Sequence, residues 1–425
     1  MKVLIRQGLV VGRETRVADV LVIDGKVREI GPGLAARGAE VVDAEGCWVG
    51  PAFVDLHAHL REPGHEDAET IESGARAAAV GGYGAVIAMP NTEPPLDSVA
   101  AVGYVLEAGR RALVDVGAAA AITVGRRGEN LTPMAELAAI GVRLFTDDGV
   151  AVRDAAVLRR ALAYARPLGV RVAEHAEDPD LVAEGVMNEG VWSGRLGLTG
   201  RPAVAELVTV LRDLELAREV GAPIHFLHVS TAAALAAIVS ARRGGVDVSA
   251  EIAPHHFTLD ESACEHYDAN FKVNPPLRTP ADVAALRRGL REGEIDAVAT
   301  DHAPHAPEAK DQPFDEAPAG VLGLEHAAAL TFEALGAESA EPTRFFAVLS
   351  RRPAALAGLA EHGGWVEAGE TANLVVFDPQ ATWTVDRDRL HSRARNTPYH
   401  GRAMRGRART TLVRGTVVAH EGEIA

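Results

Sequence analysis

The chain has 425 residues, of which 47% are hydrophobic and 24% charged, and these fractions are typical of a folded globular protein. The formal net charge of -16 argues against broad electrostatic binding to nucleic acid or to an anionic membrane, because both partners need basic patches. The only thiols are Cys47 and Cys264, which cannot build a disulfide framework, and we expect both to be buried. No run of about 18 apolar residues and no cleavable leader is evident, so we expect a cytoplasmic location.

Both ends of the chain have the pattern of short β-strands. Residues 1–50 include VADVLVIDGKVREIG, in which Asp24-Gly25 is a hairpin signal. Residues 365–425 have the same character, with a turn predicted at Gly415 within TTLVRGTVVAHEGEI. We therefore predict that residues 1–50 and 365–425 pair into one small β-sandwich domain.

Between these ends, residues 51–364 alternate strand-like apolar runs with Ala- and Leu-rich segments of helical period. The runs are PAFVDLHAHL, GAVIAMPNT, VDVGAAAAITV, VRLFTDDG, VRVAEHAED, IHFLHVS, VDVSAEIAPHH and IDAVATDHAPH. Alternation of this kind indicates a parallel α/β architecture, and eight units predict a TIM-type (β/α)8 barrel. An open, doubly wound sheet is the alternative, which has less support because no glycine-rich dinucleotide fingerprint follows the first strand.

Potential metal ligands stand at the carboxyl ends of several predicted strands. His57 and His59 are two residues apart on an apolar strand, so both imidazoles point to the same face and can reach one ion. Four further strand ends carry Asp147-Asp148, His175, His228 and Asp301-His302. Imidazole and carboxylate ligands without a thiolate pair favour zinc, manganese or iron in a catalytic site.

The scarcity of lysine limits how two ions could be bridged. The chain has lysine only at Lys2, Lys26, Lys272 and Lys310. A carbamylated lysine at the end of the fourth strand, one common bridge, is therefore excluded. The bridge must be another anion, and either Asp147 or Asp148 is placed to supply it.

The motifs DLHAHLREPG, MPNTEP, FTDDG, HVSTAAAL, APHH, NPPLR, ATDHAPH and NTPYHG together resemble the class I dihydroorotases of the amidohydrolase superfamily. The resemblance covers essentially the whole chain. Its most specific part is the combination of REPG after the histidine pair, FTDDG in place of a strand-four lysine, and NPPLR ahead of DHAPH. It implies reversible cyclisation of N-carbamoyl-L-aspartate to L-dihydroorotate and water in de novo pyrimidine (UMP) biosynthesis, with two zinc ions per chain.

The resemblance also implies roles for individual residues. His57, His59 and Asp301 would bind one zinc, His175 and His228 the other, and Asp148 would bridge them. Asp301 would in addition transfer the proton. Asp147 is then expected to be a hydrogen-bonded loop carboxylate.

Substrate contacts follow from the same resemblance. Arg61, Asn91 and His305 would hold the substrate carboxylate, and Asn274 would contact the ring. The backbone of Ala319-Gly320 could touch substrate, whereas a side-chain contact is in doubt because Ala319 replaces the aromatic residue expected in relatives. We expect the remaining nearby histidines to orient ligands or to be structural: His65, His255, His256 and His302.

Two other functions remain to be compared with this one. A hydantoinase or allantoinase shares the barrel and the histidine pair but usually relies on the carbamylated lysine that is absent here. A non-catalytic dihydroorotase-like subunit assembling with aspartate transcarbamoylase would be expected to have lost ligands, whereas all six are present. The resemblance leaves both a homo-oligomer and a complex with that transcarbamoylase open as assemblies.

Overall fold

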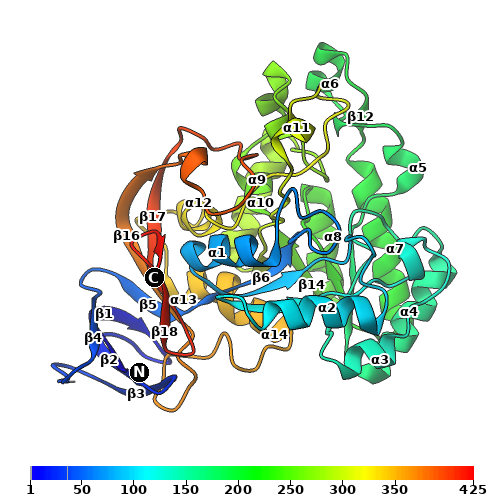
Figure 1. Ribbon diagram of the computed structural model, residues 1–425. Helices are drawn as coiled ribbons and strands as arrows, with labels where there is room; N and C mark the ends of the chain where they lie inside the picture. Colours follow the sequence, from blue (N-terminus) through cyan, green and yellow to red (C-terminus); the bar gives the residue numbers. More distant parts are fainter. Residues whose placement is uncertain (1, 36) are drawn as a thin grey trace.

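The computed structural model describes residues 2–35 and 37–425, and in it the two ends of the chain share one sheet. The strand order is β19-β18-β17-β16-β5-β1-β2-β3, with β4 beside β1. The strands from the first end are β1 (Lys2–Val11), β2 (Thr15–Ile23), β3 (Lys26–Gly31), β4 (Glu40–Asp43) and β5 (Trp48–Pro51). Those from the other end are β16 (Leu374–Thr384), β17 (Ala403–Val413), β18 (Thr416–His420) and β19 (Glu423–Ile424). Figure 1 shows the blue and red ends side by side.

Both predicted hairpins are confirmed. β2 and β3 are joined by Asp24 and Gly25, and β17 and β18 by Arg414 and Gly415. All four linking residues have positive φ, between 47° and 80°, which a two-residue turn compatible with strand twist requires. Glycine adopts this conformation without a Cβ clash, so the turn residues set the register of both hairpins.

All eight predicted central strands are present and are parallel to their neighbours. They are β6 (Phe53–Ala58), β7 (Tyr83–Ala88), β8 (Asp115–Ala118), β9 (Leu144–Phe145), β10 (Arg171–Glu174), β13 (Ile224–Phe226), β14 (Val248–Ile252) and β15 (Ala297–Val298). They form a three-stranded sheet and a five-stranded sheet. Isolated parallel bridges, Ala120 with Phe145 and Ala58 with His302, join the edges of these sheets on both sides.

A helix follows every one of these strands, as the alternating pattern predicts. In chain order these helices are α1 (Ile71–Gly81), α2 (Val99–Gly109), α3 (Met134–Ala139), α4 (Ala155–Leu168), α7 (Val204–Val220), α8 (Ala232–Arg243), α10 (Pro280–Glu292) and α12 (Ala327–Ala334). Thr70, Ser98, Asp154, Thr231 and Thr279 cap five of them with side-chain oxygens that accept backbone N–H groups. Each of these five helices begins at the residue directly after its capping residue.

Shorter elements lie in the loops after the strands and, for the last two, between α12 and β16. They are β11 (Met187–Asn188), β12 (Gly200–Arg201), α5 (Pro179–Val182), α6 (Val191–Leu196), α9 (Pro254–Thr258), α11 (Pro307–Lys310), α13 (Pro342–Phe346) and α14 (Arg352–Leu356). In Figure 1, α6, α11 and β12 lie together at the upper end of the molecule.

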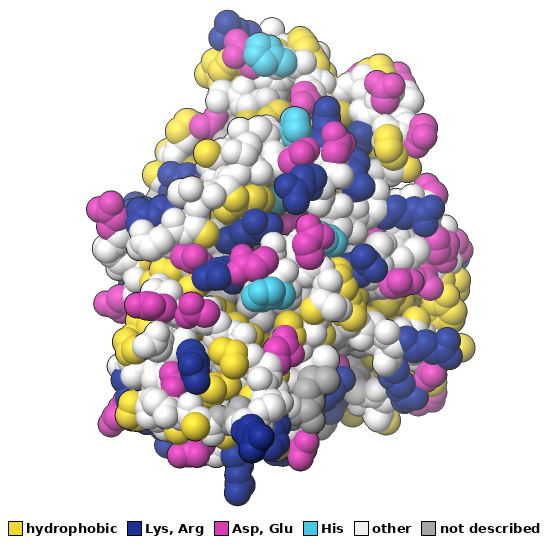
Figure 2. Space-filling model, turned by 60° about the vertical axis from the view of Figure 1, so that its left-hand side comes forward, with side chains coloured by type: hydrophobic (Ala, Val, Ile, Leu, Met, Phe, Trp, Pro, Cys, Tyr) yellow, Lys and Arg dark blue, Asp and Glu magenta, His cyan; other side chains and the backbone are white. Residues whose placement is uncertain are grey.

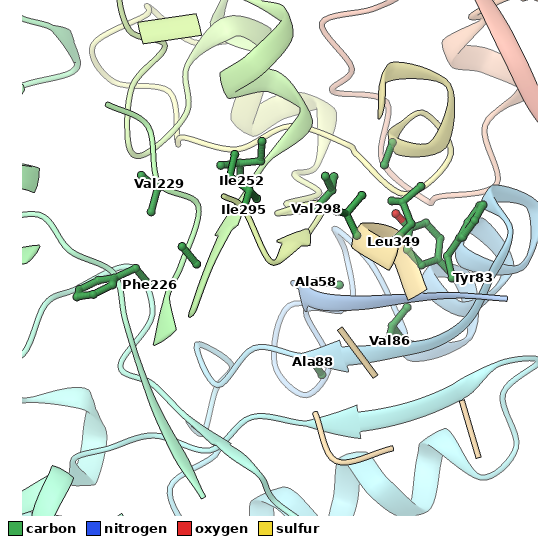
Figure 3. Packing of buried hydrophobic residues seen from close by; sticks show 14 of the residues in the cluster. Ala58, Tyr83, Val86, Ala88, Phe226, Val229, Ile252, Ile295, Val298 and Leu349 are labelled. Carbon is green, nitrogen blue, oxygen red and sulfur yellow. The ribbon is translucent and has the colours of Figure 1, made fainter. Parts of the chain in front are cut away.

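The main hydrophobic core lies between the central strands and their helices (Figure 3). Ala58, Val86, Phe226 and Val298 come from four of the strands, and each is fully or almost fully buried. Strands buried on both faces, such as β7, favour continuous rather than alternating apolar sequence. A second core joins Val3, Val20 and Val49 to Leu412, which binds the two chain ends to each other.

Charged side chains of both signs are interspersed on the face in Figure 2, where no large basic patch is visible. Cys47 and Cys264 are free and buried, as expected. Among the described residues, no helix is long and apolar enough to span a membrane.

Candidate active site

The carboxyl ends of five strands bring six predicted metal ligands together. His57 lies near the end of β6 and His59 directly follows it, and the others follow β9, β10, β13 and β15: Asp148, His175, His228 and Asp301. All six are buried, with at most 6% of any residue exposed. Two overlapping groups have ligand atoms mutually within 4.8 Å: His57, Asp148 and His228, and His57, His59 and Asp301.

Distances place Asp148 at the centre of the cluster. Its Oδ1 lies 3.4 Å from His57 Nε2, 3.6 Å from His228 Nε2 and 3.9 Å from His175 Nδ1. Its Oδ2 lies 3.6 Å from His59 Nε2. Asp148 thus faces one pair of histidines, His57 and His59, and a second pair, His175 and His228. This is the position that a bridging carboxylate needs.

Asp301 completes the first histidine pair. Its Oδ1 is 3.1 Å from His59 Nε2 and 3.6 Å from His57 Nε2. Its Oδ2 faces the other way, 3.8 Å from the unpartnered Nε2 of His255. One carboxylate oxygen therefore faces the histidine pair while the other is directed elsewhere.

Asp147 points away from the cluster. Its Oδ1 accepts hydrogen bonds from the backbone N–H groups of Ile122 and Thr123 at 2.9 and 3.0 Å, and its Oδ2 accepts one from the Thr123 hydroxyl. Consecutive residues at a strand end point to opposite sides, so only one member of the pair can face the histidines. Asp147 is the loop carboxylate that the sequence analysis expects.

Donor atoms in the cluster fit a metal. Two nitrogens bound to one tetrahedral zinc at about 2.0–2.1 Å lie about 3.3 Å apart, and His175 Nδ1 and His228 Nε2 are 3.1 Å apart. The His57 ring is fully buried, and its Nε2 has no hydrogen-bond partner. An unsatisfied buried nitrogen facing carboxylates is a position that a cation would occupy favourably.

Carboxylates orient two of the ligand imidazoles from behind. Glu251 Oε1 is 2.8 Å from His57 Nδ1, and its Oε2 is 3.1 Å from His225 Nε2. Burial alone would raise the pKa of Glu251, but the hydrogen bonds from His225 and His57 lower this pKa to about 2. Glu177 Oε2 similarly lies 3.4 Å from His175 Nε2. Partners of this kind fix the tautomer and direction of a ligand ring.

Sequence reasoning missed Glu251 and Glu177. The available signal was their residue type, because a carboxylate inside a fully buried strand such as β14, or two residues after a strand-end histidine, needs a specific partner. The histidines that were expected to orient ligands or to be structural differ in their surroundings. His256 donates through Nε2 to Pro275 O at 2.8 Å. His302 lies beside Glu69, and His65 is exposed.

The predicted substrate residues divide into two places. Asn91 lies at the metal ligands, with its Oδ1 2.8 Å from His59 Nδ1 and its Nδ2 3.4 Å from Asp148 Oδ2. Arg61 and His305 are neighbours, with Arg61 Nη2 3.4 Å from His305 Nε2. The Oδ1 of Asn274 is buried and has no hydrogen-bond partner.

Arg61 and His305 lie side by side but differ in charge. Burial and the charge of Arg61 lower the pKa of His305 to about 3, so its ring is neutral at pH 7. The ring Nε2 lies 2.8 Å from Ala319 O, to which it donates. Burial lowers the pKa of Arg61 to about 10, which keeps the guanidinium charged. The charged Arg61 guanidinium beside this neutral ring favours an anion.

Three residues of the site have positive φ. Arg61, His228 and Asp301 are non-glycine residues with φ of 62°, 28° and 47°. Such conformations cost about 1–3 kcal/mol each and persist where surrounding contacts impose them, often at functional sites. These three residues therefore hold backbone conformations that the contacts around the site impose.

The sequence is similar to those of known proteins along the whole chain. Residues 46–234 match the family model described as dihydro-orotase-like. A dihydroorotase of Pelotomaculum thermopropionicum is 45% identical over 425 residues, covering 99% of both chains, and one of Mycobacterium tuberculosis is 46% identical over 429 residues, covering 100% of both.

Solved structures of the same superfamily share the fold. The L-hydantoinase (dihydropyrimidinase) of Arthrobacter aurescens has a TM-score of 0.89 and 26% identity, covering all of this chain and 97% of its own. The dihydropyrimidinase of Brevibacillus agri has a TM-score of 0.87 and 27% identity, covering all of this chain and 96% of its own. Identity over the full length is thus much higher with the dihydroorotases, and the chain belongs to the dihydroorotase family.

Proposed function

We propose that this chain catalyses the reversible cyclisation of N-carbamoyl-L-aspartate to L-dihydroorotate and water in de novo pyrimidine biosynthesis, using two zinc ions. The observation that carries the proposal is the cluster of six buried imidazole and carboxylate side chains around Asp148. His57, His59 and Asp301 would hold one ion, His175 and His228 the other, and Asp148 would bridge them. Membership of the dihydroorotase family supports this reaction.

The two ions would supply an activated water molecule and polarise the ring amide carbonyl. Asp301 would take the proton of that water and deliver it to the leaving ring nitrogen during hydrolysis, and would reverse both transfers during ring closure. Its orientation supports this role, because Oδ1 faces His57 and His59 while Oδ2 is directed away from them. Glu251 would hold the His57 ring with Nε2 toward the ions.

The substrate carboxylate would lie against Arg61 and His305. The guanidinium is charged and would donate to the carboxylate, while the neutral His305 ring, whose Nε2–H donates to Ala319 O, would line the other side of the pocket. Asn91 is included in this pocket by resemblance, and Asn274 would contact the ring through its unpartnered Oδ1. The backbone of Ala319-Gly320 borders the pocket through the contact between Ala319 O and His305.

The architecture belongs to the same proposal. We place the domain boundaries at residues 1–50 and 365–425 for a β-sandwich and at residues 51–364 for a closed (β/α)8 barrel. The shared terminal sheet and the bridges between the two central sheets support this division. We also propose a cytoplasmic enzyme that assembles either with itself or with aspartate transcarbamoylase.

The decisive experiment compares dihydroorotate, hydantoin and allantoin as substrates of one preparation and measures its metal content. We expect two zinc ions per chain and much the highest kcat/KM with dihydroorotate. Faster turnover of hydantoin or allantoin would show that the substrate is wrong. A metal-loaded chain without activity on any of the three would support the non-catalytic subunit instead.

A further inference from the structure

We propose that Asn396 is a positioning residue for substrate specificity, which fixes the pocket for the substrate carboxylate from outside the strands that carry the metal ligands. The inference rests on the proposed function of Arg61 and His305. Asn396 lies in NTPYHG, a motif to which the reaction assigns no role. It is carried by residues 391–399, between β16 and β17 of the terminal sheet.

Residues 391–399 are attached to the loops and helices above the central strands. His391 N–H donates to Glu325 Oε1 at 2.8 Å, and Arg393 N–H donates to Glu69 Oε1 at 3.0 Å. The Tyr399 hydroxyl lies 2.8 Å from that of Thr258, the last residue of α9. Figure 1 shows this orange-to-red connection reaching from β16 toward α9 and α12.

Asn396 uses both ends of its amide on the loops that form the pocket. Its Nδ2 donates to Ala303 O at 2.9 Å and to Gly320 O at 3.0 Å, and its Oδ1 accepts from His305 N–H at 3.1 Å. The residue is only 3% exposed. One buried side chain therefore joins the loop after β15 to the segment that contains Gly320.

These contacts reach the groups proposed to bind the carboxylate. Arg61 Nε donates to Pro304 O at 3.0 Å, so the guanidinium is anchored on the same loop, residues 303–305, that Asn396 holds. His305 belongs to this loop and donates through Nε2 to Ala319 O, next to Gly320. A shift of the loop would therefore move Arg61 and His305 together.

The space around Gly320 shows how tightly the two segments meet. Its φ is +138°, and a Cβ built there would lie 2.7 Å from Ala303 Cβ and 2.8 Å from His305 Nε2. Only a planar amide offers two donors and an acceptor to these three backbone groups at once. Aspartate has the same shape but cannot donate to the two carbonyl oxygens.

The test compares Asn396→Asp and Asn396→Ala with Thr397→Ala. Thr397 is the matched control, because it is buried in the same segment but bonds to His326 and to the Tyr399 N–H instead of the pocket. For each protein, kcat and KM for dihydroorotate, zinc content and the unfolding midpoint are measured. Arg61→Met is included to test the pocket itself.

We expect the Asn396 variants to raise KM about 10- to 100-fold, as a displacement near 1 Å does, with kcat and zinc content little changed. Thr397→Ala should retain the KM of the parent. Arg61→Met should lower kcat/KM roughly 10- to 150-fold through loss of a charge-assisted hydrogen bond. On dihydrouracil, which lacks the carboxylate, all variants should resemble the parent.

An unchanged KM in the Asn396 variants, with KM raised by Arg61→Met, would overturn the positioning role alone. An unchanged kcat/KM in Arg61→Met would instead remove the carboxylate pocket from the proposed function. Loss of zinc, equal effects in Thr397→Ala, or failure of both Asn396 variants to fold while Thr397→Ala folds would make Asn396 a general structural residue and would also overturn the inference.

Discussion

At the scale of single residues, the candidate site is a set of buried charges that compensate one another. Burial alone would raise the pKa of Asp148, but His57 and His228 hold it well below its usual range. Isolated buried carboxylates are strongly disfavoured, so this one persists because positive or hydrogen-bonding partners surround it. A metal pair would provide the same compensation more strongly.

Separate replacement of Asp147 and Asp148 by alanine should distinguish their roles. We expect Asp148→Ala to lose the bound metal pair and Asp147→Ala to retain most of it, because only Asp148 faces the histidines. Metal analysis after dialysis gives the number of zinc ions per chain. Retention in Asp148→Ala with an empty Asp147→Ala would reverse the assignment.

Asp301→Asn should lower turnover in both directions by about 10² to 10⁴. The asparagine carbonyl can still face His57 and His59, but the amide can neither accept nor return the proton. Rates must be compared at equal zinc content, since Asp301 is also a proposed ligand. A zinc-loaded variant within a few-fold of the parent rate would show that another group transfers the proton.

At the scale of elements, Asp213 and Glu174 form a pair of interacting buried carboxylates at β10, the strand that His175 follows. Asp213 of α7 is fully buried, and its Oδ1 accepts from Arg212 Nε at 2.7 Å while its Oδ2 has no partner. Burial raises the pKa of Asp213 to about 7 although Arg212 opposes this. The Oε1 of Glu174, in β10, also has no partner.

This pair predicts a pH-dependent stability. Because the folded state binds the Asp213 proton more tightly than the unfolded chain, the stabilisation is complete below about pH 4 and is lost as pH rises through about 7. The free energy of unfolding of Asp213→Asn, relative to that of the parent, should therefore rise by about 1–3 kcal/mol from pH 5 to pH 8. Denaturant unfolding at both values measures the gain, and an equal difference at the two values would contradict it.

At the scale of the whole molecule, the terminal sheet and the central α/β unit depend on each other. Strand β17 is paired with β16 and β18, and the hydroxyl of its Thr411 donates to Ala79 O in α1 at 2.7 Å. Leu412 and Val413 are buried in two different cores. The last residues of the chain therefore stabilise elements that are formed from its beginning and its middle.

Removal of residues 403–425 should abolish cooperative unfolding of the whole chain, because it exposes both cores. Removal of residues 421–425 alone takes away β19, which pairs only at the edge, and should preserve the fold. Binding of a hydrophobic dye together with near-ultraviolet circular dichroism distinguishes the two results. Cooperative unfolding of the longer truncation would show that the central unit folds independently.

Several features follow from the sequence because their causes are local. The turns at Asp24-Gly25 and Gly415 depend on residues that accept positive φ, and the common face of His57 and His59 depends on the period of a strand. Eight apolar runs were enough to predict eight strands, since parallel strands are buried on both faces. Candidate ligands could be found because they stand at the ends of such runs, and the resemblance to dihydroorotases selected the six among them.

Other features were decided only by the tertiary structure, because they depend on contacts between distant segments. Asp147 and Asp148 share a strand end and a residue type, and only packing against Ile122 and Thr123 shows which of them turns away. The partnership of Glu251 with His57 spans 194 residues, and that of Asn396 with Ala303 spans 93. No local pattern encodes such distances, since they arise when a chain folds its loops over one end of its strands.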